Sequence, residues 1–258
     1  MCNKKMLPKL RKRKIMDLLQ EKESVKTGEL SDKFSVSEIT IRKDLDELAE
    51  QGALERTHGG AVAKASTLFE PTHGEKKLVR IEEKRRIGKK AASLVKEKTT
   101  ICIGTGTTTM QMIEHLDGIR DLSVVTNSLN NGYRLSKLEN IDLSIIGGDV
   151  RRKSYALVGT AAEDYFKKIY CDQLFLGVNG VSVEHGLTTP TLAEANVNRL
   201  MIEASEEVTI LADHSKFGTV VHGKIGDLDE VDNIITDTGL SQEKYESIKD
   251  KVKNVWRV

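Results

Sequence analysis

The sequence predicts an α/β protein in which a small helical module precedes a larger domain with a mostly parallel β-sheet. Two observations support this prediction. The first 62 residues place apolar side chains at helical spacing and end in a glycine-rich turn. From residue 99 onward, short apolar runs alternate with helical segments, which is typical of a sheet with helices on both faces. We therefore expect a helical domain over residues 1–62, a linker over 63–75 and an α/β domain over 76–258.

The helical module is expected to contain three helices and a hairpin. Residues 8–20 and 27–34 fit the first two helices by the spacing of their apolar residues. Ser37 is a favourable N-cap for the third helix, in which apolar residues recur at i, i+4 and i+7. Residues 54–62 then fit a two-stranded wing, because adjacent glycines can adopt the positive φ of a tight turn. The recurring apolar residues are Ile41, Leu45 and Leu48, and the glycines are Gly59 and Gly60.

Three helices followed by a wing indicate a winged helix-turn-helix that binds duplex DNA. The buried stripe of the third helix directs its other side chains to an outer face, and an α-helix fits the major groove of B-DNA. Basic side chains on that face can reach guanine edges or phosphates, and the wing can touch the backbone or the minor groove. The candidate DNA-binding residues are Ser37, Glu38, Thr40, Arg42 and Lys43 on the helix and Arg56 and His58 on the wing.

The charge distribution agrees with this interpretation. The net charge is only +1, but residues 1–14 contain seven basic residues and no acidic one. A basic excess beside the motif is what contact with phosphates requires. A charged helix alone would equally suit a solvated helical hairpin, so the prediction rests on helices, cap, wing and basic N-terminus together. RNA binding is disfavoured because only 4% of the residues are aromatic. Further phosphate contacts are expected from Lys5, Lys9, Arg11, Arg13 and Lys14.

Between the two domains the pattern changes twice. Residues 63–75 lose periodicity, and Pro71 and Gly74 mark them as a linker. Residues 75–98 then predict one long charged helix with apolar residues along one side. Such a helix could transmit a change between the domains or pack in a subunit interface.

The rest of the chain predicts the α/β domain. Strands are expected over residues 100–103, 122–126, 143–146, 173–178, 208–212, 233–236 and 254–258. Helices are expected over residues 108–115, 128–136, 161–168, 192–205 and 241–251. In an open parallel sheet, ligands bind at the carboxyl ends of the strands.

Polar residues at several of these strand ends predict a site for an anion. Residues 104–108 read Gly-Thr-Gly-Thr-Thr between a strand and a helix, where amides and hydroxyls can donate to a phosphate or carboxylate. The same residues also suit a plain tight turn. Lys216 would neutralise a phosphate, or would pair with Asp213 at the surface. The candidates for this site are Gly104, Thr105, Gly106, Thr107, Thr108, Thr126, Asn127, Gly147, Gly148, Arg151, Asn179 and Lys216.

Residues 25–60 resemble the winged helix-turn-helix of the DeoR family of bacterial sugar-metabolism regulators. The likeness rests on the string from Ser37 to Leu45 and on the Arg-Thr-His-Gly-Gly wing at 56–60, and it continues through nearly the whole chain. The family's second domain shares the fold of ribose-5-phosphate isomerase, glucosamine-6-phosphate deaminase and CoA transferases. The resemblance implies a repressor of a carbohydrate-utilisation operon that binds double-stranded operator DNA, responds to a phosphorylated sugar and forms a homo-oligomer.

The rival interpretation is a sugar-phosphate isomerase or deaminase that carries an accessory nucleic-acid-binding module. The isomerase uses an Asp-Gly-Ala-Asp segment beside its substrate, and the corresponding residues 176–179 lack both acids. Acid–base chemistry needs a titratable group within hydrogen-bond reach of the substrate. The remaining candidates, which are more often structural, are Asp213, Glu194, His185 and His214. We therefore expect no catalytic residue and no enzyme activity.

Other classes of site have little support in the sequence. The three cysteines are widely spaced and form no disulfide framework or CxxC motif, and the six histidines form no i, i+4 pair. We expect reduced thiols in a cytoplasmic protein that has neither a metal nor a cofactor. No signal peptide is recognisable, and no segment approaches the roughly 20 apolar residues of a membrane span, so no membrane partner is expected.

Overall fold

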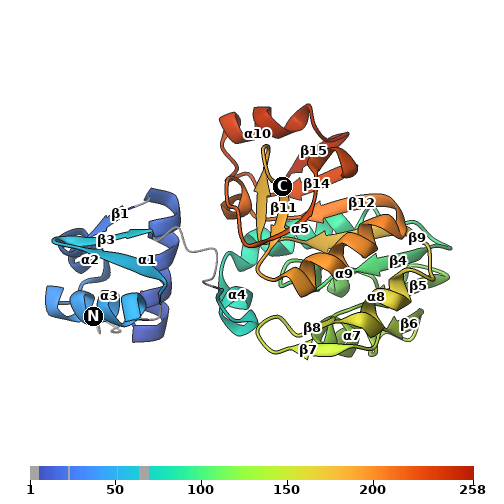
Figure 1. The fold of residues 1–258 in the computed structure, drawn as a ribbon, viewed down its shortest axis with the longest axis horizontal. Helices are drawn as coiled ribbons and strands as arrows, with labels where there is room; N and C mark the ends of the chain where they lie inside the picture. The colour runs from blue at the N-terminus through green and yellow to red at the C-terminus, as the bar shows by residue number, and fades with distance from the viewer. Residues whose placement is uncertain (1–5, 23, 51, 64–69) are drawn as a thin grey trace. The chain divides into compact units, whose positions relative to one another are not determined.

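A computed structural model describes residues 6–22, 24–50, 52–63 and 70–258 (Figure 1). The chain forms two compact units that meet in sequence between residues 69 and 70. Residues 64–69 of the predicted linker lie outside the described residues. Residues 70–75, which the sequence also assigns to the linker, are part of the second unit.

The first unit contains the three predicted helices. The elements of this unit are α1 (Pro8–Lys22), β1 (Ser24–Lys26), α2 (Thr27–Phe34), α3 (Glu38–Glu50), β2 (Leu54–Thr57) and β3 (Gly60–Ala63). The helices close over one core, to which α3 contributes Ile41, Leu45 and Leu48 as the periodicity predicts. Ser37 caps α3, because its Oγ accepts a hydrogen bond from the N–H of Thr40 at 3.3 Å.

The wing differs from the prediction in two respects. Strand β1 joins it, which gives a three-stranded antiparallel sheet in the order β1-β3-β2. The expectation of a positive φ at Gly59 and Gly60 is wrong, since neither residue adopts it. Gly60 pairs with Lys26 of β1, and a Cβ at Gly60 would lie 1.9 Å from the carbonyl oxygen of Val25. Glycine is required here because two backbones approach closely.

The second unit, residues 70–258, is built on a seven-stranded parallel sheet in the order β15-β14-β12-β9-β4-β5-β6. Each strand lies where the sequence predicts one, with small differences at the ends. The strands are β4 (Thr100–Ile103), β5 (Leu122–Thr126), β6 (Ile141–Ile145), β9 (Cys171–Gly177), β12 (Ser205–Leu211), β14 (Asn233–Thr236) and β15 (Asn254–Arg257).

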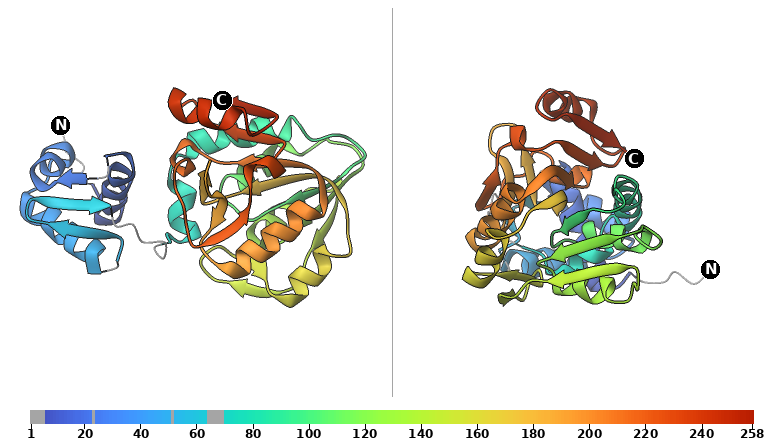
Figure 2. Two further views of the ribbon diagram at one scale, coloured as in Figure 1. Left: turned by 45° about the horizontal axis from the view of Figure 1, so that its top comes forward. Right: turned by 90° about the vertical axis from the view of Figure 1, so that its right-hand side faces the viewer.

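Helices cover both faces of this sheet (Figures 1 and 2). Because successive side chains of a strand point to opposite faces, Leu174 and Leu176 of β9 enter one buried cluster and Phe175 enters the other. Helices α8, α9 and α10 pack on the first face, and α5, α6 and α7 pack on the second. The helices are α4 (His73–Leu78), α5 (Ile81–Ala92), α6 (Thr109–Met112), α7 (Leu129–Leu135), α8 (Thr160–Phe166), α9 (Leu192–Glu203) and α10 (Gln242–Lys249). Short 3-10 turns are η1 (Ile113–His115), η2 (His214–Lys216) and η3 (Leu228–Glu230).

The small antiparallel sheets of this unit are not predicted by the apolar pattern of the sequence. They are too short for a period-two pattern to be distinguishable from a loop. One is the hairpin of β7 (Asp149–Arg151) and β8 (Ala156–Val158), and the other contains β10 (Gly180–Ser182), β11 (Gly186–Thr189) and β13 (Gly223–Gly226). Hairpins β7–β8 and β10–β11 follow the carboxyl ends of β6 and β9, so they surround the sheet edge where ligands bind.

The prediction of one helix over residues 75–98 is wrong. The segment forms α4 and α5, which are separated at Arg80 by a left-handed backbone conformation with φ 49°. This conformation places the Arg80 guanidinium 3.4 Å from Nε2 of His214 and 3.9 Å from Oδ1 of Asp213. Across the break, Lys84 Nζ donates to the carbonyl oxygen of Lys76 at 2.6 Å. Contacts to the strand ends therefore override the helical periodicity.

Candidate DNA-binding surface and effector site

The turn between α2 and α3 fixes the start of the candidate recognition helix. Ser35 ends α2 in a left-handed conformation with φ 52°. The hydroxyl of Ser31 then donates to the carbonyl oxygen of Val36 at 2.6 Å. This tight turn orients α3 so that Ile41 and Leu45 are fully buried in the core while its opposite face is exposed.

A buried ion pair joins α1 to α3. The Arg11 guanidinium donates from Nε and Nη2 to the two carboxylate oxygens of Asp44, and both side chains are nearly inaccessible to water. The prediction that Arg11 contacts phosphate is therefore wrong. Its guanidinium pairs with a buried carboxylate. The basic N-terminal sequence does not show that Arg11 has this partner. Lys5, another predicted phosphate contact, lies outside the described residues.

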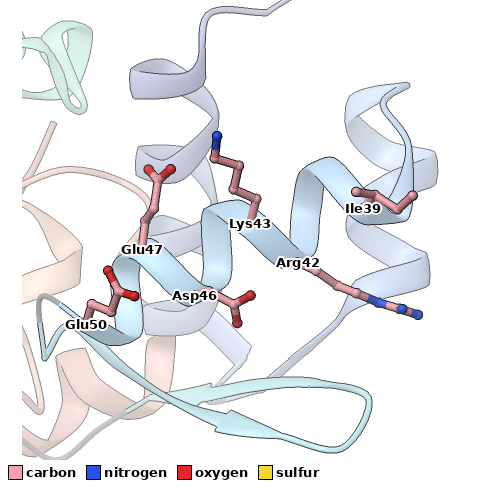
Figure 3. A pocket seen from close by; sticks show the side chains of 6 residues that line it. All are labelled: Ile39, Arg42, Lys43, Asp46, Glu47 and Glu50. Atoms are coloured by element: carbon pink, nitrogen blue, oxygen red, sulfur yellow. The ribbon is translucent and has the colours of Figure 1, made fainter.

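The exposed face of α3 is divided by charge (Figure 3). Its first half presents Arg42 and Lys43 with one carboxylate, Glu38, and its second half presents Asp46 and Glu50. Carboxylates repel phosphates, whereas basic side chains and the positive end of the helix dipole attract them. The first half of α3 is therefore the part suited to enter a DNA groove.

The predicted DNA-binding residues separate into four groups. Lys43 and His58 are exposed on α3 and on the wing turn. Arg42 is exposed and makes a 2.9 Å ion pair with Glu38, one helical turn earlier. Arg56 is bound within the unit, because it donates to Asp46 at 2.8 Å and to the carbonyl oxygen of Gly60 at 2.5 Å. Ser37 and Thr40 hydrogen bond to each other at the cap of α3.

In the second unit, the loop after β4 is connected to the end of β5. The Thr105 hydroxyl donates to Oδ1 of Asn127 at 3.2 Å. Asn131 donates to the carbonyl oxygen of Gly104 at 3.0 Å, and Thr109 donates to the same oxygen at 2.8 Å. The structure therefore brings together the loops that follow β4 and β5. The hydroxyls of Thr107 and Thr108 have no hydrogen-bond partner within residues 70–258, although both residues are 8% exposed.

Gly104 has a structural reason to be glycine. A Cβ at this position would lie 2.6 Å from Cδ1 of Leu176 on β9. Gly106 is less constrained, since a Cβ there would lie 3.2 Å from the Thr109 hydroxyl. Packing against β9 thus accounts for the first glycine without reference to a ligand.

The other predicted strand-end residues differ in their surroundings. Thr126 is fully buried, and its hydroxyl is occupied by the carbonyl oxygen of Ile103 at 2.6 Å and by the amide of Ser128 at 3.2 Å. Gly148 has φ 146° at the start of the β7–β8 hairpin, and both it and Gly147 are exposed. The Asn179 side chain accepts a 3.4 Å hydrogen bond from Thr189. The Thr126 hydroxyl therefore links adjacent strands and is not available to bind a ligand.

Arg151 lies in a charge network that the sequence pattern does not predict. Its guanidinium donates to both carboxylate oxygens of Glu70 and approaches Glu194 at 3.4 Å. Lys76 Nζ reaches the same Glu70 at 3.0 Å. Burial raises the pKa of Glu70, but Arg151 and Lys76 outweigh it and leave that pKa below its usual value. Two cations thus hold a buried carboxylate at the beginning of the unit.

Lys216 lies near a second buried carboxylate. Asp213 is 1% exposed, and its pKa is about 2, because burial is outweighed by the charges of Lys216, Lys84 and Arg80 and by a hydrogen bond from Ser215. Within residues 70–258, Lys216 has no ion pair within 4 Å, so the predicted alternative of a direct pair with Asp213 is not formed. Its half-buried ammonium group is therefore suited to bind an anion.

The cations of α4 and α5 are the functional residues that sequence reasoning missed. All three are buried or nearly so: Lys76 pairs with Glu70, Arg80 lies 3.9 Å from Asp213 beyond the end of β12, and Lys84 donates to the carbonyl oxygen of Lys76. Lys76 also lies close enough to Lys216 for its pKa to be lowered by that charge, after the larger effect of burial. The sequence pattern of this segment is that of a charged, solvated helix. Spacing alone does not show which of its lysines are buried.

The candidate catalytic residues are held by neighbours. His214 Nδ1 lies 2.7 Å from Asp237, and this hydrogen bond raises the pKa of His214 against the effect of burial. Glu194 contacts Arg151, and the exposed His185 lies 3.9 Å from Glu184. Within the described ranges, no group of three or more His, Cys, Asp or Glu residues is arranged to hold a metal ion. No helix among the described residues is long and apolar enough to cross a membrane.

Comparison with known proteins assigns both units to one family. Residues 11–67 match the DeoR-like helix-turn-helix domain, and residues 79–238 match the DeoR C terminal sensor domain. This chain belongs to the DeoR family. The predicted combination of a winged helix-turn-helix with a mostly parallel α/β domain is confirmed, and this DeoR-family chain is a DNA-binding transcriptional regulator.

Individual relatives cover nearly the whole length. The regulator is 38% identical over 244 residues to the HTH-type transcriptional regulator GlpR of Haloferax volcanii, with 95% of each chain covered. It is 35% identical over 223 residues to the glycerol-3-phosphate regulon repressor of Escherichia coli K12, with 86% of this chain and 88% of the relative covered. A solved ribose 5-phosphate isomerase from Plasmodium falciparum matches 53% of this chain and 52% of its own at 19% identity and a TM-score of 0.39.

Proposed function

We propose that this DeoR-family protein represses a carbohydrate-utilisation operon and that a phosphorylated sugar controls its binding to operator DNA. The observation that supports the proposal best is the gathering of cations at the strand ends of the second unit. Lys76, Lys84, Arg151 and Lys216 lie there among buried carboxylates. A relative over most of the chain is named a glycerol-3-phosphate regulon repressor, which favours a phosphate ester as the ligand.

The proposed phosphate site is formed by the loop after β4 together with Lys216. The unpartnered hydroxyls of Thr107 and Thr108 would donate to phosphate oxygens, and the Lys216 ammonium would supply the opposite charge. Asn127, which already orients Thr105, would shape the sugar side of the site. Gly147, Gly148 and Asn179 would form its rim.

We further propose that effector binding is coupled to DNA binding through Glu70. This carboxylate is 7% exposed, and it occupies Arg151 and Lys76 in the manner of an anionic ligand. An effector phosphate held at Lys216, whose charge lowers the pKa of the nearby Lys76, would compete with Glu70 for Lys76. Glu70 is the first residue of the second unit, so its release would act on that unit at the point nearest in sequence to the DNA-binding unit. Such competition gives the effector the unequal affinity for two states that allosteric control requires.

On this proposal the protein acts as a homo-oligomer without enzyme activity. Paired recognition helices bind two half-sites, which suits the symmetric operators of helix-turn-helix proteins. The acid–base candidates of the sensor unit are bound to neighbouring side chains, as His214 is to Asp237. The rival proposal, an isomerase or deaminase, requires turnover of a sugar phosphate.

A thermal-shift screen against phosphorylated sugars and glycerol 3-phosphate tests the proposed ligand class. A ligand that binds the native state increases the free energy of unfolding by mass action, by about 2.7 kcal/mol at 100 times its Kd, and so raises the melting temperature. We expect one phosphate ester to stabilise the protein and its unphosphorylated counterpart not to do so. Equal shifts with both compounds, or conversion of the phosphate ester to another sugar phosphate, would contradict the proposal.

A further inference from the structure

Ile39 is the most exposed large apolar residue of the first unit among the described residues. Its exposed fraction is 77%, compared with 71% for Leu7 and 44% for Leu10. It is the second residue of α3 and takes no part in the core of the unit. A β-branched residue has a lower helix propensity than alanine or leucine, so local helix stability does not explain its presence.

Two basic residues lie near Ile39 on α3, and Glu38, which directly precedes it, is paired with one of them. Arg42 and Lys43 follow Ile39 by three and four residues, the spacing that brings side chains together on one helix face. The three side chains line one shallow hollow with the acidic residues of the second half of α3 (Figure 3). Ile39 lies at the end of that face where the charge favours DNA, farthest from Glu50.

The major groove offers one apolar group to such a side chain. Thymine carries a C5-methyl group there, while the other base edges present hydrogen-bond donors and acceptors. Recognition helices of this class contact base edges with their N-terminal residues. An isoleucine at the second position, flanked by cations that hold the phosphates or guanines, has the chemistry to contact that methyl group.

We propose that Ile39 reads a thymine methyl group in the operator and thereby contributes to sequence specificity. This inference rests on the proposed function, because it requires α3 to enter the major groove. Removing the methyl group from DNA and removing the side chain from the protein then delete the same contact. The two losses are not additive, as expected for groups that touch.

The experiment uses the full chain and the duplex that the wild-type protein enriches from a random DNA pool. The duplex is prepared with thymine or with uracil throughout, which removes only the 5-methyl groups. Wild-type affinity is expected to fall about fourfold for each methyl group that Ile39 contacts. Ile39→Ala should bind the thymine duplex more weakly and respond little to the exchange. Leu7→Ala, a matched exposed apolar residue, should retain the wild-type response.

The outcomes separate the two levels of the proposal. Failure to enrich any duplex would overturn the proposed DNA-binding function itself. Enrichment, followed by equal uracil responses in wild type and Ile39→Ala, would overturn the role of Ile39 while leaving that function intact. Circular dichroism of Ile39→Ala is expected to match wild type, because alanine is compatible with an exposed helical position. If Ile39→Ala loses helicity, Ile39→Val replaces it, because valine keeps the β-branch and shortens the side chain. We expect the affinity of Ile39→Val to respond to the uracil exchange less than wild type does and more than Ile39→Ala would.

Discussion

Arg151 donates hydrogen bonds to both carboxylate oxygens of Glu70, which joins the beginning of the sensor unit to the hairpin that follows β6. Lys76 shares the same carboxylate at 3.0 Å, and Glu194 approaches the guanidinium at 3.4 Å. A charge cluster of this kind resembles a ligand site occupied by part of the protein. The proposed competition between an effector anion and Glu70 would act at this cluster.

Glu70→Gln tests this competition. Removing the carboxylate charge leaves Arg151 and Lys76 without their shared counterion, so we expect tighter binding of the phosphate ester found by thermal shift. Operator affinity should also become less dependent on that compound, because the competing state is lost. The measurements are calorimetric titration with the ester and operator binding in its presence. Glu82→Gln, an exposed carboxylate of α5 paired with Arg85, is the matched control and should behave as wild type. Weaker ester binding by Glu70→Gln would contradict the competition.

The Arg11–Asp44 pair predicts a large stability effect in the first unit. Asp44→Ala leaves the Arg11 guanidinium buried without a counterion, and breaking a buried pair in this way costs about 3–5 kcal/mol. Asp46→Ala, two residues away on the same helix, removes an exposed pair with Arg56 and should cost at most about 1 kcal/mol. Urea unfolding of the full chain, monitored by a probe in the first unit, distinguishes the two variants. Similar midpoints for both variants would refute the buried character of the pair.

Arg42 is predicted to read a base. Its guanidinium is exposed on the basic half of α3 and is oriented by Glu38. Arg42→Ala should weaken binding to the selected duplex by about 1–3 kcal/mol and leave binding to random DNA much less affected. Anisotropy titrations at several salt concentrations measure both effects. An equal loss on the two DNAs, with a salt slope reduced by about one, would show that Arg42 contacts only phosphate.

The His214–Asp237 pair predicts a pH dependence of the second unit. The Asp237 hydrogen bond raises the pKa of His214 above its ordinary value of 6.5. The pair therefore contributes its full stability below about pH 6.5, and this contribution is lost as the pH rises through the folded-state pKa. In Asp237→Asn this decline should be much smaller. Melting temperatures measured across this range decide the point, and parallel curves for the two proteins would contradict the assignment.

The sheet was predictable because its strands are strongly apolar and alternate with helices. Residues such as Leu174 and Phe175 are buried on either face of the sheet, so their strand can be predicted from its apolar run without knowledge of the fold. The same holds for the Ser37 cap and the stripe at Ile41, Leu45 and Leu48, which depend only on local spacing. Where local preference and tertiary packing agree, sequence suffices.

The site was only partly predictable, because charge pairing is set by tertiary contacts. The sequence predicts Arg11 at a phosphate, but its guanidinium pairs with Asp44. It predicts Thr126 at a ligand, but its hydroxyl donates to the carbonyl oxygen of Ile103 on the neighbouring strand. The break at Arg80 also depends on distant partners, Asp213 and His214. No spacing along the chain encodes contacts between residues more than a hundred positions apart. The DNA-binding and effector roles assigned to individual residues therefore stay predictions.

The most direct test of the account is operator binding measured with and without a phosphorylated sugar. Wild-type protein is titrated against its selected duplex in the presence of each phosphate ester, alongside Lys216→Ala and the exposed control Lys168→Ala. We expect one ester to change wild-type affinity by about fivefold or more, the usual range of allosteric coupling. Lys168→Ala should show the same change, and Lys216→Ala should bind the duplex normally but lose the response. Operator binding that no ester alters, or a full response in Lys216→Ala, would contradict the proposal that these strand ends sense a phosphate ester.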